Sequence, residues 1–491
     1  MIILNRVDII LLLPVNPLFL LQVRKGRMAQ SLFSEFAPSN LNAWKKQAIK
    51  DLKEKDFDAT LLWHTPEGIS VWPYYTSENI DNERLPALQV VQKQKMGWLN
   101  QPVVVFDGNE TSTNAQIISI LQKGAEAILL DFSNVSIADI ALSKLLHGLK
   151  LSDTPVVFRA YGQETELTAA LQNFIPYQMK GGLAHDALAH WTQTGQLPSH
   201  WAQQTAALID STNNSPLFRT LCVQSHALHN AGANAAQELA FVLASATTYL
   251  DKLTDLGVGI EKILPKLYFS ISVGTNYFME MAKLRALRYL WAVMSKQWPT
   301  PANYQLPAAF IHAQTSTFYN TAAAPYTNLL RATTEAMSAT VGGCDALTVL
   351  PYNEIANVPD NFADRIARNV SVLLKEESHL DKTADAVAGS YFIENLTLQL
   401  IDAAWALFLE VEKKGGFLAA FEQNFVQTQI RQTYERKRQN MITNAEIMVG
   451  VNKYQMPNDT LEVAQLATNS DLANSLGFDL LPNQRVGLIE K

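Results

Sequence analysis

From about residue 101 onward, short apolar runs alternate with amphipathic segments of helical period, and this alternation constrains the fold more than any other feature of the chain. Apolar runs bounded by turn residues are typical of parallel strands that helices cover on both faces. A series of right-handed strand–helix units either closes into a barrel or opens as a doubly wound sheet, and the local pattern is compatible with both. The pattern therefore predicts an α/β fold with a parallel sheet.

The expected elements follow one another at similar spacing along the chain. Strands are expected at 103–107, 127–132, 155–160, 220–225 and 308–314, and helices at 114–123, 137–149, 164–173, 235–256, 277–294 and 326–340. Between 180 and 216 the pattern weakens into a polar connection. The tail over 396–444 is expected to be helical. Gly415-Gly416 within it is typical of the C-terminal cap of one helix followed by the start of another.

The composition narrows the class of protein. A chain of 491 residues suits one large barrel with additions, because α/β barrels often exceed about 250 residues as single units. The formal charge is -7 and no basic stripe stands out, so nucleic acid is not an expected partner. Cys222 and Cys344 are too few for a disulfide framework or a four-thiolate metal site, and both lie in apolar segments. We expect buried thiols in a cytoplasmic protein.

The first residues contain an apolar run, 9–23, that resembles a membrane anchor. Pro14 and Pro17 interrupt it, it is shorter than the roughly 20 residues that a spanning helix needs, and basic residues follow rather than precede it. We interpret residues 1–27 as a non-native extension before Met28 and expect no stable membrane insertion. A membrane-associated N-terminus is the alternative.

Residues 28–95 are expected to form an N-terminal arm that contacts another subunit. The periodicity predicts a helix over 44–53, and the segment 58–63 is strand-like. Large apolar side chains in a polar arm are typical anchors at an interface. The candidate contact residues are Phe33, Phe36, Trp44 and Trp72.

Ordered sequence blocks over 223–454 resemble one known family. The blocks are VGTNYFMEMAKLRALRYLWA at 273–292, HAQTS at 312–316, the TEAM and VGG elements within 326–343, DRIARN at 364–369, KEES at 375–378, AGSY at 388–391 and GVNKY at 450–454. They resemble the barrel of the methylmalonyl-CoA mutase family, and the upstream segment 67–76 resembles the arm of the small subunit in bacterial two-chain mutases. The resemblance implies a (β/α)8 TIM barrel with an N-terminal arm and C-terminal helices, over 96–480, followed by a tail at 481–491.

The resemblance also shows where this chain departs from the family. The family's active-site segment reads roughly SGYHMQEAGA, and its Tyr-His pair corresponds to His226-Ala227 here. A methyl side chain neither donates nor accepts a proton, so Ala227 cannot replace the family's histidine. On the expected strand His226 points to the opposite side from its neighbour, so a shift by one place does not restore the geometry.

Further departures fall in two other blocks. The family's PRLSFF, associated with coenzyme A contacts, becomes PKLYFS at 265–270, and its LHTNSFDE becomes LTVLPYNE at 347–354. Lysine keeps the charge of arginine but loses its planar fork, and tyrosine is large enough to fill a channel. We expect a degenerate pocket without catalytic, cofactor-binding or metal-binding residues, lined by His226, Ala227, Lys266, Tyr268, His312, Gln314 and Thr348.

The cofactor of the family is adenosylcobalamin, which the family binds in a separate Rossmann-like domain with a DxHxxG motif. The final histidine of this chain is His379, and no Gly-rich α/β unit is recognisable after Tyr454. The resemblance therefore implies that adenosylcobalamin is bound by a partner large subunit.

Other polar residues have two interpretations each. His226 and His229 are spaced as two metal ligands would be, but a third ligand is not evident nearby. Ser390 after a glycine suggests either an activated hydroxyl or a turn, and Gly342-Gly343 suggests either a phosphate loop or a helix end. A further set of charged residues either contacts a substrate or forms structural ion pairs. Its members are Glu280, Lys283, Arg285 and Arg288.

The resemblance and the departures together predict the small, non-catalytic subunit of a heterodimeric methylmalonyl-CoA mutase. An active mutase for another acyl-CoA, using a separate cobalamin-domain protein, or a barrel adapted to unrelated chemistry is the alternative. A third hypothesis, compatible with the first, is a docking module for a cobalamin-loading GTPase chaperone.

Overall fold

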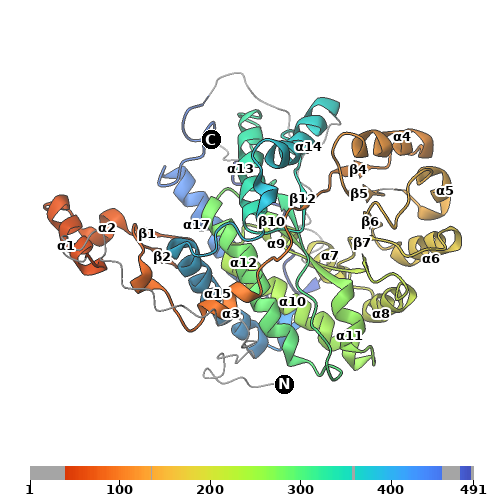
Figure 1. The fold of residues 1–491 in the computed structure, drawn as a ribbon, viewed down its shortest axis with the longest axis horizontal. Helices are drawn as coiled ribbons and strands as arrows, with labels where there is room; N and C mark the ends of the chain where they lie inside the picture. The colour runs from red at the N-terminus through yellow and green to blue at the C-terminus, as the bar shows by residue number, and fades with distance from the viewer. Residues whose placement is uncertain (1–38, 134, 357–359, 456–475, 488–491) are drawn as a thin grey trace, which may run out of the picture.

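Eight parallel strands close into a barrel in the computed structural model, which describes residues 39–133, 135–356, 360–455 and 476–487 (Figure 1). One five-stranded sheet has the order β3 (Leu99–Asn100), β12 (Ala346–Thr348), β11 (Ile311–Thr315), β10 (Leu267–Val273) and β9 (Leu221–Gln224). The other has the order β4 (Val103–Val105), β5 (Ile128–Asp131), β6 (Val156–Arg159), β7 (Gly181–Leu183) and β8 (Phe218–Arg219).

The two sheets share their outer strands. Strand β3 continues into β4 through Gln101 and Pro102, and β8 continues into β9 through Thr220. Both edges of one sheet are therefore joined to the edges of the other, and the ring is closed. The predicted (β/α)8 barrel is confirmed.

Helices follow the strands around the outside of the ring. They are α4 (Glu110–Leu121), α5 (Leu142–Leu145), α6 (Glu164–Phe174), α7 (Ala187–Thr194), α8 (Trp201–Ser211), α9 (His226–Asn230), α10 (Ala235–Asp255), α11 (Ile260–Ile263), α12 (Tyr277–Met294), α13 (Thr327–Val341) and α14 (Asn361–Glu376). Three further helices, α15 (Tyr391–Lys413), α16 (Gly416–Glu422) and α17 (Phe425–Ile442), follow the barrel, with Gly415 in a left-handed conformation between α15 and α16.

The barrel has two separate hydrophobic cores. Strands β4–β8 and helices α4–α6, which we call the first half-barrel, enclose one core with a ladder of aromatic rings, Phe106, Phe132, Phe158 and Phe218. Strands β9–β12 and their helices, which we call the second half-barrel, share the larger core with α7, α15, α16 and α17. The side chains of the two cores lie on the outer faces of the strands, which leaves the inner faces for other residues.

Three local predictions are wrong. The segment 180–216 is not a polar connection but contains β7, α7 and α8, because its exposed Gln, Ser and His residues cover a buried face that includes Trp191 and Trp201. The segment 58–63 is mostly helix α2 (Phe57–Leu61), with Asp56 as its N-cap. The expected helix at 137–149 shortens to a 3-10 turn at Ile137–Asp139 and the short α5.

The N-terminal arm projects from the barrel (Figure 1). It contains α1 (Leu41–Leu52), α2 and the small hairpin of β1 (Trp63–His64) and β2 (Ser70–Val71). Trp44 packs against Phe57 and Tyr74, with ring centroids 6.1 and 5.1 Å apart, and Phe57 packs against Trp72 at 5.9 Å. Phe33 and Phe36 lie outside the described residues. The arm therefore has an aromatic cluster of its own, joined to the barrel near α3 (Leu85–Val90).

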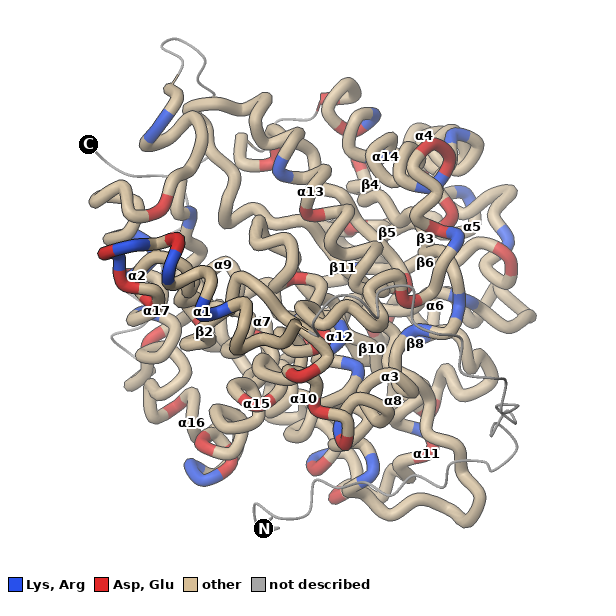
Figure 2. The backbone as a smooth tube through the Cα atoms, turned by 60° about the vertical axis from the view of Figure 1, so that its left-hand side comes forward, with Lys and Arg blue, Asp and Glu red and all other residues tan. Residues whose placement is uncertain are grey.

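Charged residues lie on the outer helices, and the most apolar helix packs inside the fold. Positive and negative residues alternate along the outer helices, including α1 and α2 (Figure 2). Among the described helices, only α15 is long and apolar enough to cross a membrane, and half of its apolar window is buried inside the structure. Its hydropathy is explained by its packing against α10 and α12.

Candidate functional site

The residues on the inner face of the second half-barrel are set by strand register. Ser270 of β10 lies opposite His312 of β11, and two residues further along Ser272 lies opposite Gln314, which pairs with Thr348 of β12. Paired residues of neighbouring strands point to the same face, so these polar side chains converge inside the barrel. The structure thus brings together three residues that the sequence assigned to the degenerate pocket.

A continuous series of hydrogen bonds crosses this interior. Consecutive groups are 2.6 to 2.8 Å apart, and all of the side chains are at least partly buried. We call the series the interior chain; its members are Ser272, His226, Ser270, His312, Thr348 and the backbone carbonyl of Gln101.

The direction of the interior chain follows from its last member. A carbonyl oxygen only accepts, so the Thr348 hydroxyl donates to Gln101 and must accept from Nε2 of His312. Nδ1 of His312 then accepts from the Ser270 hydroxyl, and Ser270 accepts from Nε2 of His226. Nδ1 of His226 is left to accept from Ser272. Every ring nitrogen has one partner and each imidazole carries one proton.

Electrostatics keep both imidazoles neutral. Burial lowers the pKa of His312 to about 3, and the Arg159 guanidinium acts in the same direction. Burial, His312 and Arg159 hold the pKa of His226 well below its usual value. Because neither ring titrates near neutral pH and neither has a free nitrogen, the pair offers no general acid, general base or metal ligand there.

The structure corrects the local geometry of His226 and Ala227. His226 begins helix α9 instead of continuing a strand, because β9 ends at Gln224. Consecutive helical residues point about 100° apart, so His226 enters the barrel while Ala227 is buried in the outer hydrophobic core. Ala227 therefore has no access to the interior chain.

Lys266 and Tyr268 occupy different environments. The Lys266 ammonium donates to the carbonyls of Thr212, Ser215 and Phe218 at 2.7, 2.7 and 3.0 Å, and burial lowers its pKa to about 8. The Tyr268 hydroxyl donates to the carbonyl of Leu183 at 3.1 Å, and its ring lines a small cavity inside the barrel. Lysine thus ties the second half-barrel to the first, and tyrosine occupies part of the interior.

The opposite inner wall carries an ion pair that the sequence analysis missed. Asp131 of β5 and Arg159 of β6 are paired in register and their side chains lie 2.9 Å apart. The Tyr161 hydroxyl also donates to Asp131, at 3.3 Å. The sequence feature that could have identified this pair is a charged residue at the carboxyl end of each of two consecutive apolar strands.

His229 belongs to a second buried polar cluster, next to the barrel. Its Nδ1 lies 2.8 Å from Glu238 and its Nε2 lies 2.7 Å from Ser316. Lys283 contacts both Glu238 and Glu280, at 3.1 and 2.6 Å. Within the described part of the chain no group of three or more metal-ligating side chains occurs, so the zinc interpretation finds no support in this geometry.

The remaining candidates have structural environments. Arg285 pairs with Asp385 and Glu394, and Arg288 pairs with Asp345, in nearly complete burial. Ser390 is the N-cap of α15 and accepts from the amide of Ile393. Gly342 is the C-cap of α13.

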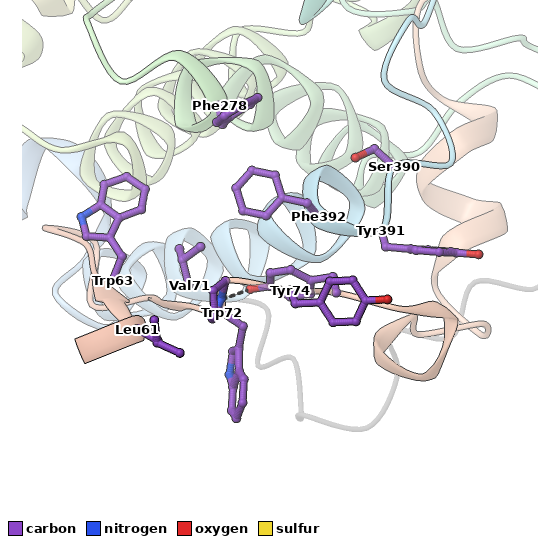
Figure 3. A pocket seen from close by; sticks show the side chains of 11 residues that line it. Leu61, Trp63, Val71, Trp72, Tyr74, Phe278, Ser390, Tyr391 and Phe392 are labelled. Atoms are coloured by element: carbon purple, nitrogen blue, oxygen red, sulfur yellow. Dashed lines mark hydrogen bonds between the residues drawn. The ribbon is translucent and has the colours of Figure 1, made fainter. Parts of the chain in front are cut away.

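An apolar groove of about 630 Å³ lies between the arm and the barrel (Figure 3). Trp63 and Tyr74 of the arm, Phe278 at the start of α12 and Tyr391 at the start of α15 are each 44–46% exposed. The rest of the lining is Leu61, Val71, Trp72, Pro73, Tyr75, Ser390 and Phe392. Because large aromatic side chains are enriched at protein interfaces, the groove has the character of a contact surface.

Comparisons with known proteins point to one family. The profile of the family described as "Methylmalonyl-CoA mutase" matches residues 133–475. A "Methylmalonyl-CoA mutase small subunit" of Porphyromonas gingivalis is 35% identical over 450 residues, covering 89% of this chain and 72% of that protein. One of Streptomyces virginiae is 35% identical over 448 residues, covering 86% and 72%. A "Methylmalonyl-CoA mutase" of Cereibacter sphaeroides is 30% identical over 476 residues, covering 87% and 66%.

Proposed function

The chain belongs to the methylmalonyl-CoA mutase family, and within that family we propose that it is the small, non-catalytic subunit of a two-chain enzyme. Its role is to support a large catalytic subunit that interconverts methylmalonyl-CoA and succinyl-CoA. Two of the similar proteins carry the name small subunit, while others are named simply as the mutase. The choice between these roles depends on the chemistry of the barrel interior.

The interior chain is the observation that carries the proposal. In a working acid–base site a polar group must be free to exchange a proton with the substrate. Here both imidazoles are neutral and both nitrogens of each ring are occupied by hydroxyl groups of the same barrel. The interior is satisfied by its own residues, which favours a structural role over a catalytic one.

The cofactor is assigned to the partner on the same grounds. Adenosylcobalamin supplies radical chemistry to the family when it is bound. His226 and His312 have no nitrogen available for cobalt or substrate, and burial of Ala227 removes the second position of the family's Tyr-His pair from the interior. These residues do not fit an active cobalamin site, and we infer that the large subunit binds the cofactor in the cytoplasm.

The groove between arm and barrel is the proposed contact with the large subunit. Its exposed rings Trp63, Tyr74, Phe278 and Tyr391 come from four separate segments that meet at one place (Figure 3). Trp44 stabilises the arm behind this surface through its contact with Tyr74, and Trp72, which also lines the groove, does so through its contact with Phe57. A cobalamin-loading GTPase chaperone is a further proposed partner of the complex.

A mutase assay with adenosylcobalamin on each chain alone and on the co-expressed pair tests the proposal. We expect turnover by the pair, none by this chain alone, and association that light scattering detects. The His312→Gln substitution in the pair should leave turnover unchanged, because that ring performs no chemistry. Turnover or adenosylcobalamin binding by this chain alone would contradict the proposal and support an independent mutase.

The contact surface has its own test. The double substitution of Trp63→Ser and Tyr391→Ser should weaken association at least tenfold while leaving the melting temperature of the isolated chain nearly unchanged, because both rings are half exposed. A matched control is Tyr454→Ser, which removes an exposed ring away from the groove. Equal association of the double variant and the control would place the interface elsewhere.

A further inference from the structure

A small cavity of about 180 Å³ opens at the end of the barrel where the strands begin. Several of its lining residues immediately precede strands: Pro155 before β6, Lys180 before β7, Leu217 before β8 and Phe310 before β11. Catalytic residues of (β/α)8 barrels come from the opposite, carboxyl ends of the strands. The cavity is therefore distinct from the place where a barrel of this type performs chemistry.

Two cations face this cavity without a carboxylate partner. Arg219 and Lys180 both line it, and neither forms an ion pair with any residue in the described ranges. Gly182, opposite Arg219 in the neighbouring strand, has no side chain that could cover the guanidinium. The guanidinium carbon lies 4.0 Å from the centroid of the Phe310 ring, which holds the group in place.

The side-chain amide of Gln101 is also available at this site. Gln101 is only 4% exposed and lines the cavity, yet its side-chain amide hydrogen-bonds to no residue that the structure describes. Among the described residues, the buried polar atoms that lack a partner do not include the amide of Gln101, so this amide is open to the cavity and available to a ligand or to water there. Neutral His312 beside it adds no charge, because its two nitrogens bond Ser270 and Thr348.

The other walls are apolar. Leu99, Val157 and Leu217 contribute aliphatic surface, and Phe310 contributes a ring. A volume of about 180 Å³ holds roughly six non-hydrogen atoms if each occupies about the 30 Å³ of a water molecule in the liquid. A nucleotide is far too large, and inorganic phosphate or sulfate would leave the aliphatic walls without contacts.

We propose that this cavity binds a short-chain monocarboxylate of about four carbons, with its carboxylate on Arg219 and Gln101 and its hydrocarbon tail against Val157 and Leu217. The guanidinium supplies a charge-assisted hydrogen bond, and Lys180 adds a second positive charge at the mouth. The site does not depend on the proposed subunit role, because the ligand contacts the side chain of Gln101, whereas the interior chain uses only the backbone carbonyl of that residue, and because no residue of the groove is involved.

Isothermal titration of the full-length chain with sodium acetate, butanoate, hexanoate and octanoate tests the proposal. Each added methylene should tighten binding about fourfold while the tail fills the cavity, since a buried methylene contributes about 0.8 kcal/mol. The series should reach its maximum at butanoate and fall at hexanoate and octanoate. Sulfate at the same concentration should bind at least tenfold more weakly than the best acid.

Two substitutions test separately how the charge of Arg219 and the apolar walls of the cavity contribute to binding. Arg219→Gln should weaken butanoate binding at least tenfold, and Val157→Phe, which retains the cation, should abolish the gain with chain length. Arg431→Gln, which removes a surface arginine, should bind as the unchanged chain does. Circular dichroism confirms the fold of each variant, and if Arg219→Gln does not fold, the chain-length series with Val157→Phe decides.

Three outcomes would overturn the proposal. They are no heat with any acid, equal binding of sulfate and butanoate, and a chain-length dependence that Val157→Phe leaves unchanged. The last two would place the anion on a surface cation outside this cavity.

Discussion

The first and second half-barrels have the same strand topology but bury their helices differently. Helix α4 of the first half buries only Thr113 and Ile117, whereas α10 of the second half is buried along most of its length. The cause is the C-terminal layer: α15 packs on α10 and α12, so these helices are covered on both sides. A helix enclosed in this way is apolar on most of its surface, while a peripheral helix needs only one apolar face.

This difference indicates where the family resemblance is strongest. The sequence blocks that resemble the mutases are concentrated in the second half-barrel, where a substitution has to fit neighbours on two sides. Close-packed interiors tolerate few changes of volume. The first half-barrel, with a core of its own, has more freedom to change. Its core is expected to open at lower free energy than that of the second half.

The largest expected effect comes from the two cores. Phe158→Ala removes a fully buried ring from the aromatic ladder of the first half-barrel and should cost about 3–5 kcal/mol. Native-state hydrogen exchange should show the loss of protection in β4–β8 while β10 and α12 remain protected. The matched variant Phe241→Ala, in α10, should reduce protection in both halves. Equal loss everywhere after Phe158→Ala would mean that the halves unfold as one unit.

A second prediction concerns the connection between the halves. Lys266→Met leaves three carbonyls of the first half-barrel without their shared donor and should lower the free energy of unfolding by up to about 3 kcal/mol. Urea titration measures this change. Lys262→Met, four residues earlier, removes only an exposed pair with Asp210 and should cost at most about 1 kcal/mol. If both variants cost the same, the buried lysine does not tie the halves.

A third prediction uses pH to separate the polar interior from the apolar cores. The folded-state pKa of His312 is about 3 and the unfolded value is near 6.5, so between these values the unfolded chain binds the extra proton and stability falls as pH decreases. The contribution of His312 to the free energy of unfolding is about 2 kcal/mol lower at pH 5 than at pH 7.5. The destabilisation caused by His312→Gln should therefore shrink by about 2 kcal/mol over this range.

Denaturant titrations at several pH values measure that difference. Comparing the variant with the unchanged chain at each pH removes the contributions of other groups, including Glu335, whose burial raises its pKa to about 8 and gives the opposite slope between about pH 4.5 and 8. His147→Gln alters an exposed ring of the first half-barrel and serves as the control. A pH-independent effect of His312→Gln would show that the fold does not lower the pKa of this ring.

The smallest expected effect on stability is at the arm. Lys45 lies over the rings of Phe57 and Trp72, at 4.9 and 4.8 Å from their centroids, and is half-buried. Lys45→Gln should lower the melting temperature by no more than the equivalent of about 1 kcal/mol, because exposed cation–π contacts contribute little. Lys46→Gln, one residue further along α1, is the control. A larger loss would show that the arm and the barrel unfold together.

Part of this architecture could be predicted from the sequence. Apolar strands 127–132 and 155–160 and helix 277–294 are visible because burial on both faces leaves continuous apolar runs. Helices α7 and α8 were missed because their exposed faces are polar and rich in Gln, and only Trp191 and Trp201 mark a buried side.

The candidate site was less predictable than the fold. The sequence assigned His312, Gln314 and Thr348 to one pocket, but the contact between His226 and Ser270 requires the turn from strand β9 into helix α9. The Asp131–Arg159 pair depends on the register of β5 and β6, which local patterns do not specify. Long-range pairing of this kind is a property of the closed ring.

The interior chain also has a consequence for proton movement. A row of hydroxyls and imidazoles at 2.6 to 2.8 Å would ordinarily form a wire along which protons hop from group to group. This wire ends at the carbonyl of Gln101, an amide oxygen that has no proton of its own to pass onward. A proton that entered this row at Ser272 could not leave it at Gln101. The interior chain therefore does not conduct protons through the centre of the barrel.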